Sequence, residues 1–295
     1  MAPTRPEICA GLQGGLGNQL FQYAAGRALA ARLGAELSVH PRARGAAGIK
    51  AVGLAELGLT PRMRTGHGGP LRRAALNLAK PIARALGRDV VKTPPGWRGR
   101  IHRERGFAYD PVFETLQGSW YLAGYFQSWR YFAAIADELR ADLRAGAEAA
   151  LPRDAELPDL SGDSVSVHLR LGDYADPANA RIHGVLPAKY FAAACARIRE
   201  ARPDARFFLF SDQPREARAR LSGLDLTVVE GGSRAADLAL MARCRHHVIA
   251  NSTFSWWGAW MGPGGITVAP RQWFAPEKQA GMDLSDLFPE GWIRV

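Results

Sequence analysis

Cysteine is scarce in this sequence: Cys9, Cys195 and Cys244 are the only three among 295 residues. Their odd number, scattered positions and apolar neighbours exclude a disulfide framework and predict buried thiols in a reducing compartment. Long apolar runs are also missing, so the sequence predicts no membrane-spanning helix, and the N-terminus lacks the apolar core of a signal peptide. We therefore expect a cytoplasmic protein whose only membrane contact is peripheral.

Motifs that bind metal ions or nucleic acid are absent as well. The sequence contains no DxD, HExxH or CxxC pattern, and His67, His102 and His183 stand without ligand spacing. We therefore expect no metal and no cofactor. There is also no zinc-finger spacing, RNP-like aromatic motif or clear helix-turn-helix, which argues against nucleic acid as a partner.

Arginine, in contrast, is abundant. The formal net charge is +10, the pI is about 10.0, and basic residues are concentrated between Arg62 and Arg105. An anionic substrate, an anionic inner membrane face and nucleic acid could each use this charge, whereas a coding bias toward Ala and Arg would explain it without any function. Peripheral membrane contact is thus one expectation, and an Arg-rich nucleic-acid-binding protein is the less favoured alternative.

Strands alternate with helices along most of the chain, which predicts an α/β fold of two Rossmann-like domains facing a cleft. The Pro- and Gly-containing segment Ala149–Gly162 is the predicted linker. It divides a first domain, residues 1–155, from a second domain, residues 156–295, whose C-terminal tail is expected to return to the first. The main predicted strands are 8–12, 35–40, 120–126, 165–169, 207–210, 226–229, 247–250 and 266–269. The predicted helices are 20–33, 71–86, 131–143, 187–201, 214–221, 235–242 and 255–261.

A glycine-rich loop, Gly14-Gly15-Leu16-Gly17-Asn18-Gln19, lies between the first predicted strand and helix. Glycines at this place let backbone amides approach a phosphate at the positive end of the helix dipole. The spacing matches neither GxGxxG nor a Walker loop. A tight turn that needs positive φ therefore explains these glycines equally well.

The segment Val165–Tyr174 is an apolar alternating run that ends in ionisable residues around a glycine. Alternation places His168 and Arg170 on one face of the predicted strand. Ligands of open α/β sheets collect at strand carboxyl ends, and the guanidinium of Arg170 suits a diphosphate. Asp173 could brace Arg170 or meet a sugar hydroxyl, although a purely structural ion pair is the alternative.

Two further predicted strands end in polar residues. Ser211 and Asp212 precede Pro214, where a helix cap explains them better than a contact to a nucleotide base does. Asn251, Ser252, Thr253 and Ser255 surround another helix start. They supply more hydroxyl and amide groups than one cap uses, which favours a phosphate site.

Together these motifs resemble the bacterial α1,2-fucosyltransferases of glycosyltransferase family 11. The resemblance runs from residue 8 to about 274, skips the basic region, and implies a GT-B-like fold, GDP-fucose as donor, a β-galactoside acceptor and inversion without a metal. It also implies that residues 1–155, with the Gly-rich loop and the basic region, form the acceptor-side domain and that residues 156–295 form the donor-binding domain. The segments that carry the resemblance are Gly14–Tyr23, Gly124–Ser128, His168-x-Arg170-x-Gly172-Asp173-Tyr174, His183–Leu186, Ser211-Asp212 and Asn251–Ala259.

The resemblance also implies roles for single residues. Arg170 would hold the donor diphosphate, Asn18 would lie near the β-phosphate and the fucose, and Asp212 would contact guanine. The remaining expected donor-site residues are Gly14, Gly15, Gly17, His168, Asn251, Ser252, Thr253 and Ser255. Leu171 is a departure, because many relatives have a second arginine at this position.

The expected reaction is a direct displacement at the anomeric carbon of fucose. The transition state is oxocarbenium-like, and Arg170 would stabilise the charge that grows on the departing GDP. Asn18, Arg170 and Asp173 are the predicted catalytic residues. The motifs identify no base, so Asp173 is the first candidate and His183 or Asp176 a weaker one. Transfer from another GDP-sugar is the nearest alternative reaction.

Overall fold

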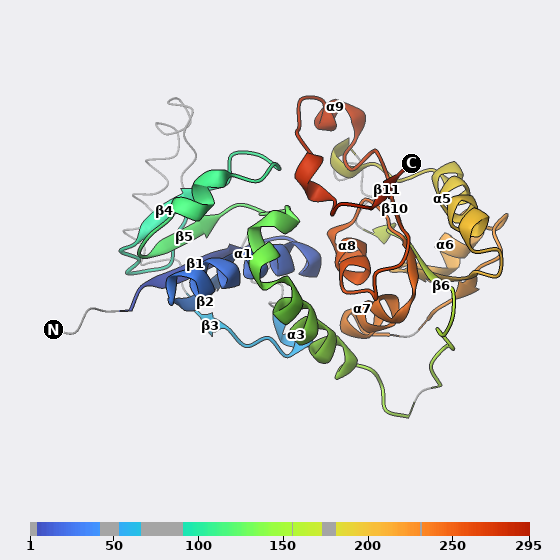
Figure 1. Ribbon diagram of the computed structural model, residues 1–295, viewed down its shortest axis with the longest axis horizontal. Helices are drawn as coiled ribbons and strands as arrows, with labels where there is room; N and C mark the ends of the chain where they lie inside the picture. The colour runs from blue at the N-terminus through green and yellow to red at the C-terminus, as the bar shows by residue number, and fades with distance from the viewer. Residues whose placement is uncertain (1–4, 42–52, 66–90, 155, 173–180, 231) are drawn as a thin grey trace. The chain divides into compact units, whose positions relative to one another are not determined.

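The computed structural model describes residues 5–41, 53–65, 91–154, 156–172, 181–230 and 232–295. The chain divides into two compact units. The first comprises Met1–Leu54, Thr60–Ile135 and Ser285–Leu287, and the second comprises Ala55–Leu59, Ala136–Leu284 and Phe288–Val295. Both units contain a parallel sheet with helices (Figure 1), which confirms the predicted α/β class.

The sheet of the first unit has the strand order β3-β2-β1-β5-β4, and all of its strand pairs among the described residues are parallel. Its strands are β1 (Glu7–Leu12), β2 (Glu36–Pro41), β3 (Arg62–Met63), β4 (Arg100–Arg103) and β5 (Trp120–Ala123). Because the strands run in one direction, the chain leaves β1, β5 and β4 at the same edge. The glycine-rich loop follows β1 at this edge.

Helix α1 (Leu16–Leu33) connects β1 to β2 and packs beside them (Figure 1). It comes close to the sheet at Gly26, where an added Cβ would stand 3.0 Å from Leu37 and 3.1 Å from Ala10. The helix ends at the predicted stop, Gly34, which adopts φ 58°. It begins four residues earlier than predicted, so Gly17 and Asn18 belong to its first turn.

The sheet of the second unit has the order β11-β10-β9-β6-β7-β8 and is parallel throughout the described residues. Its strands are β6 (Ser164–Leu169), β7 (Arg206–Ser211), β8 (Thr227–Val228), β9 (His246–Val248), β10 (Thr267–Ala269) and β11 (Ile293–Arg294). The helices of this unit are α3 (Ala136–Glu148), α5 (Ala188–Ala201), α6 (Pro214–Arg220), α7 (Arg234–Arg243), α8 (Thr253–Trp260) and α9 (Pro276–Gln279). Helix α3 packs against α7.

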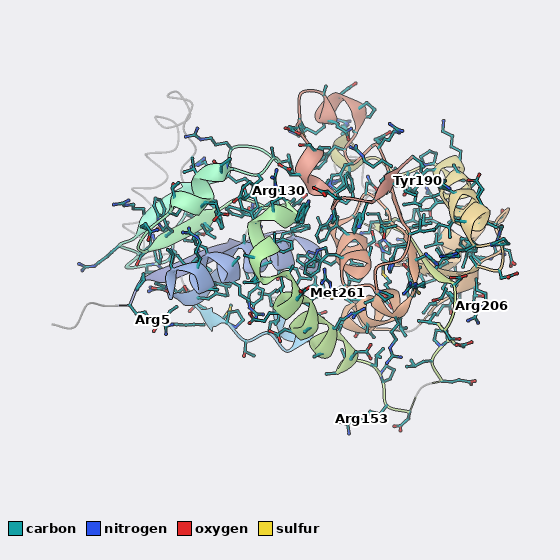
Figure 2. All side chains as sticks on the ribbon, in the orientation of Figure 1. Arg5, Arg130, Arg153, Tyr190, Arg206 and Met261 are labelled. Carbon is teal, nitrogen blue, oxygen red and sulfur yellow. The ribbon has the colours of Figure 1, made fainter. Side chains whose placement is uncertain are left out.

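The two faces of β6 have different neighbours. Val165, Val167 and Leu169 enter a buried apolar cluster that also contains Phe191 of α5. On the other face Ser166 contacts the ring of a histidine in β9, with 2.8 Å between Oγ and Nδ1 of His247. Tyr190 of α5, labelled in Figure 2, donates its hydroxyl to the carbonyl of Ile249 at 2.6 Å. The first contact joins the middles of β6 and β9, and the second holds the chain just after β9, where the candidate site lies.

Two predicted elements of the first half have different bounds in the structure. The strand expected over residues 120–126 stops at Ala123, because Phe126 adopts φ 54° in the turn that follows. The helix expected over residues 131–143 is divided into the 3-10 segment η3 (Trp129–Ile135) and α3. The backbone is non-helical at Phe132, whose fully buried ring lies 6.0 Å from that of Phe21.

Several short elements were not predicted: β3, β4, β11, α9 and the 3-10 segments η1 (Gly53–Leu57), η2 (Pro111–Thr115) and η5 (Ser285–Leu287). The segment η5 belongs to the first unit, and α3 belongs to the second. The acceptor-side and donor-binding roles of the two halves stay predictions. The helix expected over residues 71–86 lies outside the described residues.

Candidate functional site

Arg170 follows β6 directly and is held by Asp212, which follows the neighbouring strand β7. Their side chains form an ion pair with 3.1 Å between Nη1 and Oδ2, and both are partly exposed. The other carboxylate oxygen of Asp212 accepts the backbone N–H of Leu171 at 3.0 Å. The sequence suggested Asp173 as the brace of Arg170, but Asp173 lies outside the described residues, and Asp212 makes this contact.

Gly172 has no side chain, and the carboxylate of Asp212 lies in the space that a side chain would fill. A Cβ at Gly172 would stand 2.2 Å from Oδ2 of Asp212, far inside contact distance. The glycine is therefore required for the ion pair between Asp212 and Arg170. The contact of Asp212 to guanine stays a prediction, and in this structure both carboxylate oxygens have protein partners.

His168 belongs to β6, two residues before Arg170, and is 3% exposed. Burial, and then the charge of Arg170, lower the pKa of His168 to about 3, so its ring is neutral near pH 7. The ring lies 5.6 Å from that of Phe254, in the first turn of α8. This contact brings the carboxyl end of β6 to the beginning of α8.

The N-terminus of α8 follows β9 at the same edge of the sheet. β6 pairs with β9 in the register Val167 to Val248, which, if continued, places Arg170 level with Asn251. Ser252 is the N-cap, and its Oγ accepts the backbone N–H of Phe254 at 3.3 Å. A helix N-terminus presents backbone N–H groups and a positive dipole end, both of which favour an anion.

The four polar residues at this helix start differ in what they can offer a ligand. Asn251 is 3% exposed and donates its amide to the carbonyls of His183, Gly184 and Trp273. Ser255 is fully buried and donates to the carbonyl of Ser252 at 3.1 Å. Only Thr253 is partly exposed. The phosphate contacts expected of all four stay predictions, and the described contacts favour the helix N-terminus over these side chains as the anion-binding group.

The glycine-rich loop lies in the first unit and is braced by glutamines of α1. Gly14 has φ 79°, and both Gly14 and Gly15 are exposed. Gln19 donates to the carbonyl of Gly14 at 3.0 Å, and Gln22 accepts the N–H of Gln13 at 2.9 Å. The tight turn suggested by the sequence is therefore present, with its backbone fixed by side chains.

Comparison with known proteins identifies the family. The model of glycosyl transferase family 11 matches residues 111–295. The chain belongs to this family. An alpha-1,2-colitosyltransferase of Escherichia coli is 30% identical, with 98% of each chain covered. The human galactoside alpha-(1,2)-fucosyltransferase 1 is 27% identical over 54% of this chain and 47% of its own. The solved fucosyltransferase NodZ from Bradyrhizobium is 14% identical, covers 87% of this chain and 92% of its own, and has a TM-score of 0.44.

Leu171 is the position where this family 11 glycosyltransferase departs from the expected second arginine. Its side chain is 1% exposed and belongs to the same apolar cluster as Val165, Val167 and Leu169. Alternation along the chain turns position 171 toward the core, whereas Arg170 points to the opposite face. An arginine at 171 would bury its charge in that cluster, so packing explains the leucine.

The described residues of this glycosyltransferase contain no group of three or more His, Cys, Asp or Glu side chains that could hold a metal ion. Within the same residues, no helix is both long and apolar enough to cross a membrane. The three cysteines are unpaired and buried. Burial raises the pKa of Cys9 to about 11 and that of Cys195 and Cys244 to about 12, so the thiols stay protonated.

Two residues near the glycine-rich loop were not identified from the sequence. Gln127 donates its amide to Oδ1 of Asn18 at 2.9 Å. Glu104 follows β4, and its Oε2 accepts the N–H groups of Tyr125 and Phe126 at 2.6 and 2.9 Å. Gln127 could have been identified from the sequence, because it lies in the Gly124–Ser128 segment that carries the family resemblance. Glu104 could not, because it lies among arginines and outside every motif.

Proposed function

We propose that this protein transfers L-fucose from GDP-fucose to the 2-hydroxyl of a terminal β-galactoside in a surface glycan or oligosaccharide, with inversion and without a metal. The observation that carries the proposal is the ion pair of Arg170 with Asp212 beside the N-terminus of α8. These groups lie at the carboxyl edge of a parallel sheet, where open α/β folds bind nucleotides. Membership of glycosyl transferase family 11 supports the reaction class.

The donor diphosphate would bind to Arg170. A guanidinium has five N–H donors in a planar fork, and an arginine braced on one side by a carboxylate can present other donors to phosphate oxygens. The N-terminus of α8 adds backbone N–H groups and a partial positive charge. Both are oriented before the reaction, so they stabilise the negative charge that grows on GDP as the glycosidic bond breaks.

The acceptor hydroxyl attacks the anomeric carbon from the face opposite GDP, which inverts its configuration. Because GDP is stabilised in this way, it leaves readily, and the acceptor hydroxyl can attack without a strong base. Asp173 is the first candidate base, and His183 and Asp176 follow it. Asn18 would act near the β-phosphate and the fucose, an assignment that rests on the family resemblance.

Colitose is a second candidate for the transferred sugar. The relative that matches 98% of this chain is named an alpha-1,2-colitosyltransferase, whereas the fucosyltransferase of human origin matches 54% of it. Colitose is fucose without its 3-hydroxyl, so the diphosphate site described above serves either donor. The residues that contact the sugar ring decide between the two.

A transfer assay tests the proposed function. Purified protein is incubated with lactose and, separately, with GDP-fucose, GDP-colitose, GDP-mannose and UDP-galactose, with and without EDTA, and products are identified by NMR. We expect an α1,2-linked product from GDP-fucose, at a rate that EDTA does not change. A higher kcat/KM with GDP-colitose would assign colitose instead. Turnover of UDP-galactose alone would contradict both proposals.

We also propose that the protein works in the cytoplasm and docks at the anionic inner membrane face. The support for this is the exposed basic side chains around β4, namely Lys92, Arg98, Arg100 and Arg105. Each basic residue near an anionic membrane surface contributes about 1 kcal/mol of attraction. Flotation with phosphatidylglycerol vesicles at low and high salt tests the proposal, and the absence of co-flotation at low salt would remove it.

A further inference from the structure

The turn Gly124–Ser128 follows β5 at the edge of the first sheet where β1 enters the glycine-rich loop. Its sequence, GYFQS, is part of the family resemblance, but the proposed function assigns no role to these residues. Two contacts, one of Glu104 and one of Gln127, determine the conformation of this turn and the direction of its side chains.

Glu104 is the first of these contacts. Its Oε2 accepts both N–H groups at Tyr125 and Phe126, and Phe126 adopts φ 54°, a conformation that non-glycine residues rarely take. Gly124 makes room for the carboxylate, because a Cβ there would stand 2.4 Å from Cβ and 2.6 Å from Oε2 of Glu104. Glu104 therefore holds the turn in a strained form that sets the direction of the next residue, Gln127.

Gln127 is the second contact, and it links the turn to α1. Its Nε2 donates to Oδ1 of Asn18 at 2.9 Å, and Gln127 is 5% exposed, so its own side chain is shielded. Because the carbonyl oxygen of Asn18 is engaged, the amide nitrogen of Asn18 points to the opposite side. That nitrogen lies 2.5 Å from where a Cβ at Gly14 would stand, over the exposed part of the loop.

The bond between Gln127 and Asn18 is separate from the bonds that fix the loop backbone. Gln19 bonds the carbonyl of Gly14 and the N–H of Gly53. Gln22 bonds the N–H of Gln13 and the carbonyl of Gly124. Both of these glutamines act on backbone groups, whereas Gln127 acts on a side chain. Its removal therefore leaves the loop backbone with its other supports.

We propose that Gln127 is a positioning residue, which turns the amide of Asn18 so that its NH₂ group faces the glycine-rich loop. The ligand expected there is the oxygen-rich sugar-phosphate part of a GDP-sugar, which needs hydrogen-bond donors, so the opposite orientation of Asn18 would present a carbonyl oxygen to it. This inference rests on the proposed function and assigns a role to the Gly124–Ser128 turn, which is to hold Gln127 beside Asn18.

A double-mutant cycle tests the inference. Turnover of GDP-fucose is measured for Gln127→Met, Asn18→Ala and the double variant, with Gln117→Met as the control, because Gln117 is exposed in the same unit. Misorientation of a ligand-binding group is expected to lower kcat/KM for the donor about 10- to 100-fold in Gln127→Met. If Gln127 acts through Asn18, it adds less than about a threefold loss in the Asn18→Ala background. Equal losses in both backgrounds, or an unchanged Gln127→Met, would overturn the proposal.

A second measurement separates this inference from the proposed function. If the wild type turned over no GDP-sugar, the proposed function would fail, but the contact would remain testable by NMR of ¹⁵N-labelled protein. The side-chain NH₂ signals of Asn18 are identified by their loss in Asn18→Ala. We expect them to shift in Gln127→Met and to stay in place in Gln117→Met. Signals that do not move in Gln127→Met would overturn the positioning role, whatever the activity.

Discussion

At the scale of single residues, the proposed donor site depends on a glycine, a residue that has no side chain. Gly172 lies against Asp212, and a methyl group there would stand 2.2 Å from Oδ2. Gly172→Ala should therefore displace Asp212, release Arg170 and weaken GDP binding about tenfold or more. Titration calorimetry with GDP measures this effect. Gly223→Ala is the matched control, because no atom lies within 4 Å of an added Cβ at Gly223. Equal GDP affinity in the two variants would mean that Asp212 does not position Arg170.

The carboxyl group of Glu104 should make the stability of the fold depend on pH. Burial raises the pKa of Glu104 from 4.5 to about 7, against the hydrogen bonds from Phe126 and Tyr125, which lower it. At a pH between these two pKa values, Glu104 is protonated in the folded protein and ionised in the unfolded chain. The free energy of unfolding therefore falls as the pH rises from about 4.5 to 7.

Glu104→Gln cannot lose a proton, so it should escape this weakening. The free energy of unfolding of Glu104→Gln, relative to the wild type, should rise by up to about 3 kcal/mol between pH 5 and pH 8. Urea titrations at several pH values measure this difference. Glu277→Gln, at an exposed site, serves as the control. A constant difference for Glu104→Gln across this range would show that the carboxyl titrates normally.

At the scale of elements, the N-terminus of α8 is the second anion-binding group of the proposed site. Ser252 caps α8 by accepting the N–H of Phe254, and Ser233 caps α7 by accepting the N–H of Ala236. Loss of a serine cap costs about 1 kcal/mol of stability, so Ser252→Ala and Ser233→Ala should lower Tm by similar amounts. Only Ser252→Ala should also weaken GDP binding, because α8 begins beside Arg170. Equal weakening by both variants would contradict the assignment of α8.

The elements that the sequence predicted well are those whose pattern is local. The end of α1 at Gly34 and the bounds of β6 and β7 follow from a glycine stop and from apolar alternation. The errors arose where distant contacts override the pattern. The run that begins at Trp120 looks like a longer strand, but after Ala123 the chain turns, and the carboxylate of Glu104, which follows β4, accepts the N–H groups of that turn.

At the scale of the whole molecule, the sequence indicated which strand ends carry the candidate residues, but not which side chains contact one another there. The strand ends after β6, β7 and β9 were each predicted to carry ligand-binding residues, and their parallel sheet brings these ends to one edge. The strand end after β1 was predicted to do so as well, but it belongs to the other sheet. The pairing of Arg170 with Asp212 was not predicted, because it joins residues 42 positions apart whose proximity depends on strand order. The hydrogen bond from Gln127 to Asn18 joins residues 109 positions apart and could not be predicted for the same reason.

Arg170 is proposed to hold the diphosphate of a GDP-sugar, and the proposed function depends on this contact more than on any other. Titration calorimetry of the intact protein with GDP tests it most directly, with Arg170→Ala compared against Arg206→Ala. Arg206, labelled in Figure 2, pairs with Asp159 at 3.1 Å but lies at the opposite end of β7, at its start. Loss of a charge-assisted contact should weaken GDP binding about 10- to 100-fold in Arg170→Ala and leave Arg206→Ala unchanged. Wild-type affinity for GDP in Arg170→Ala would contradict the claim.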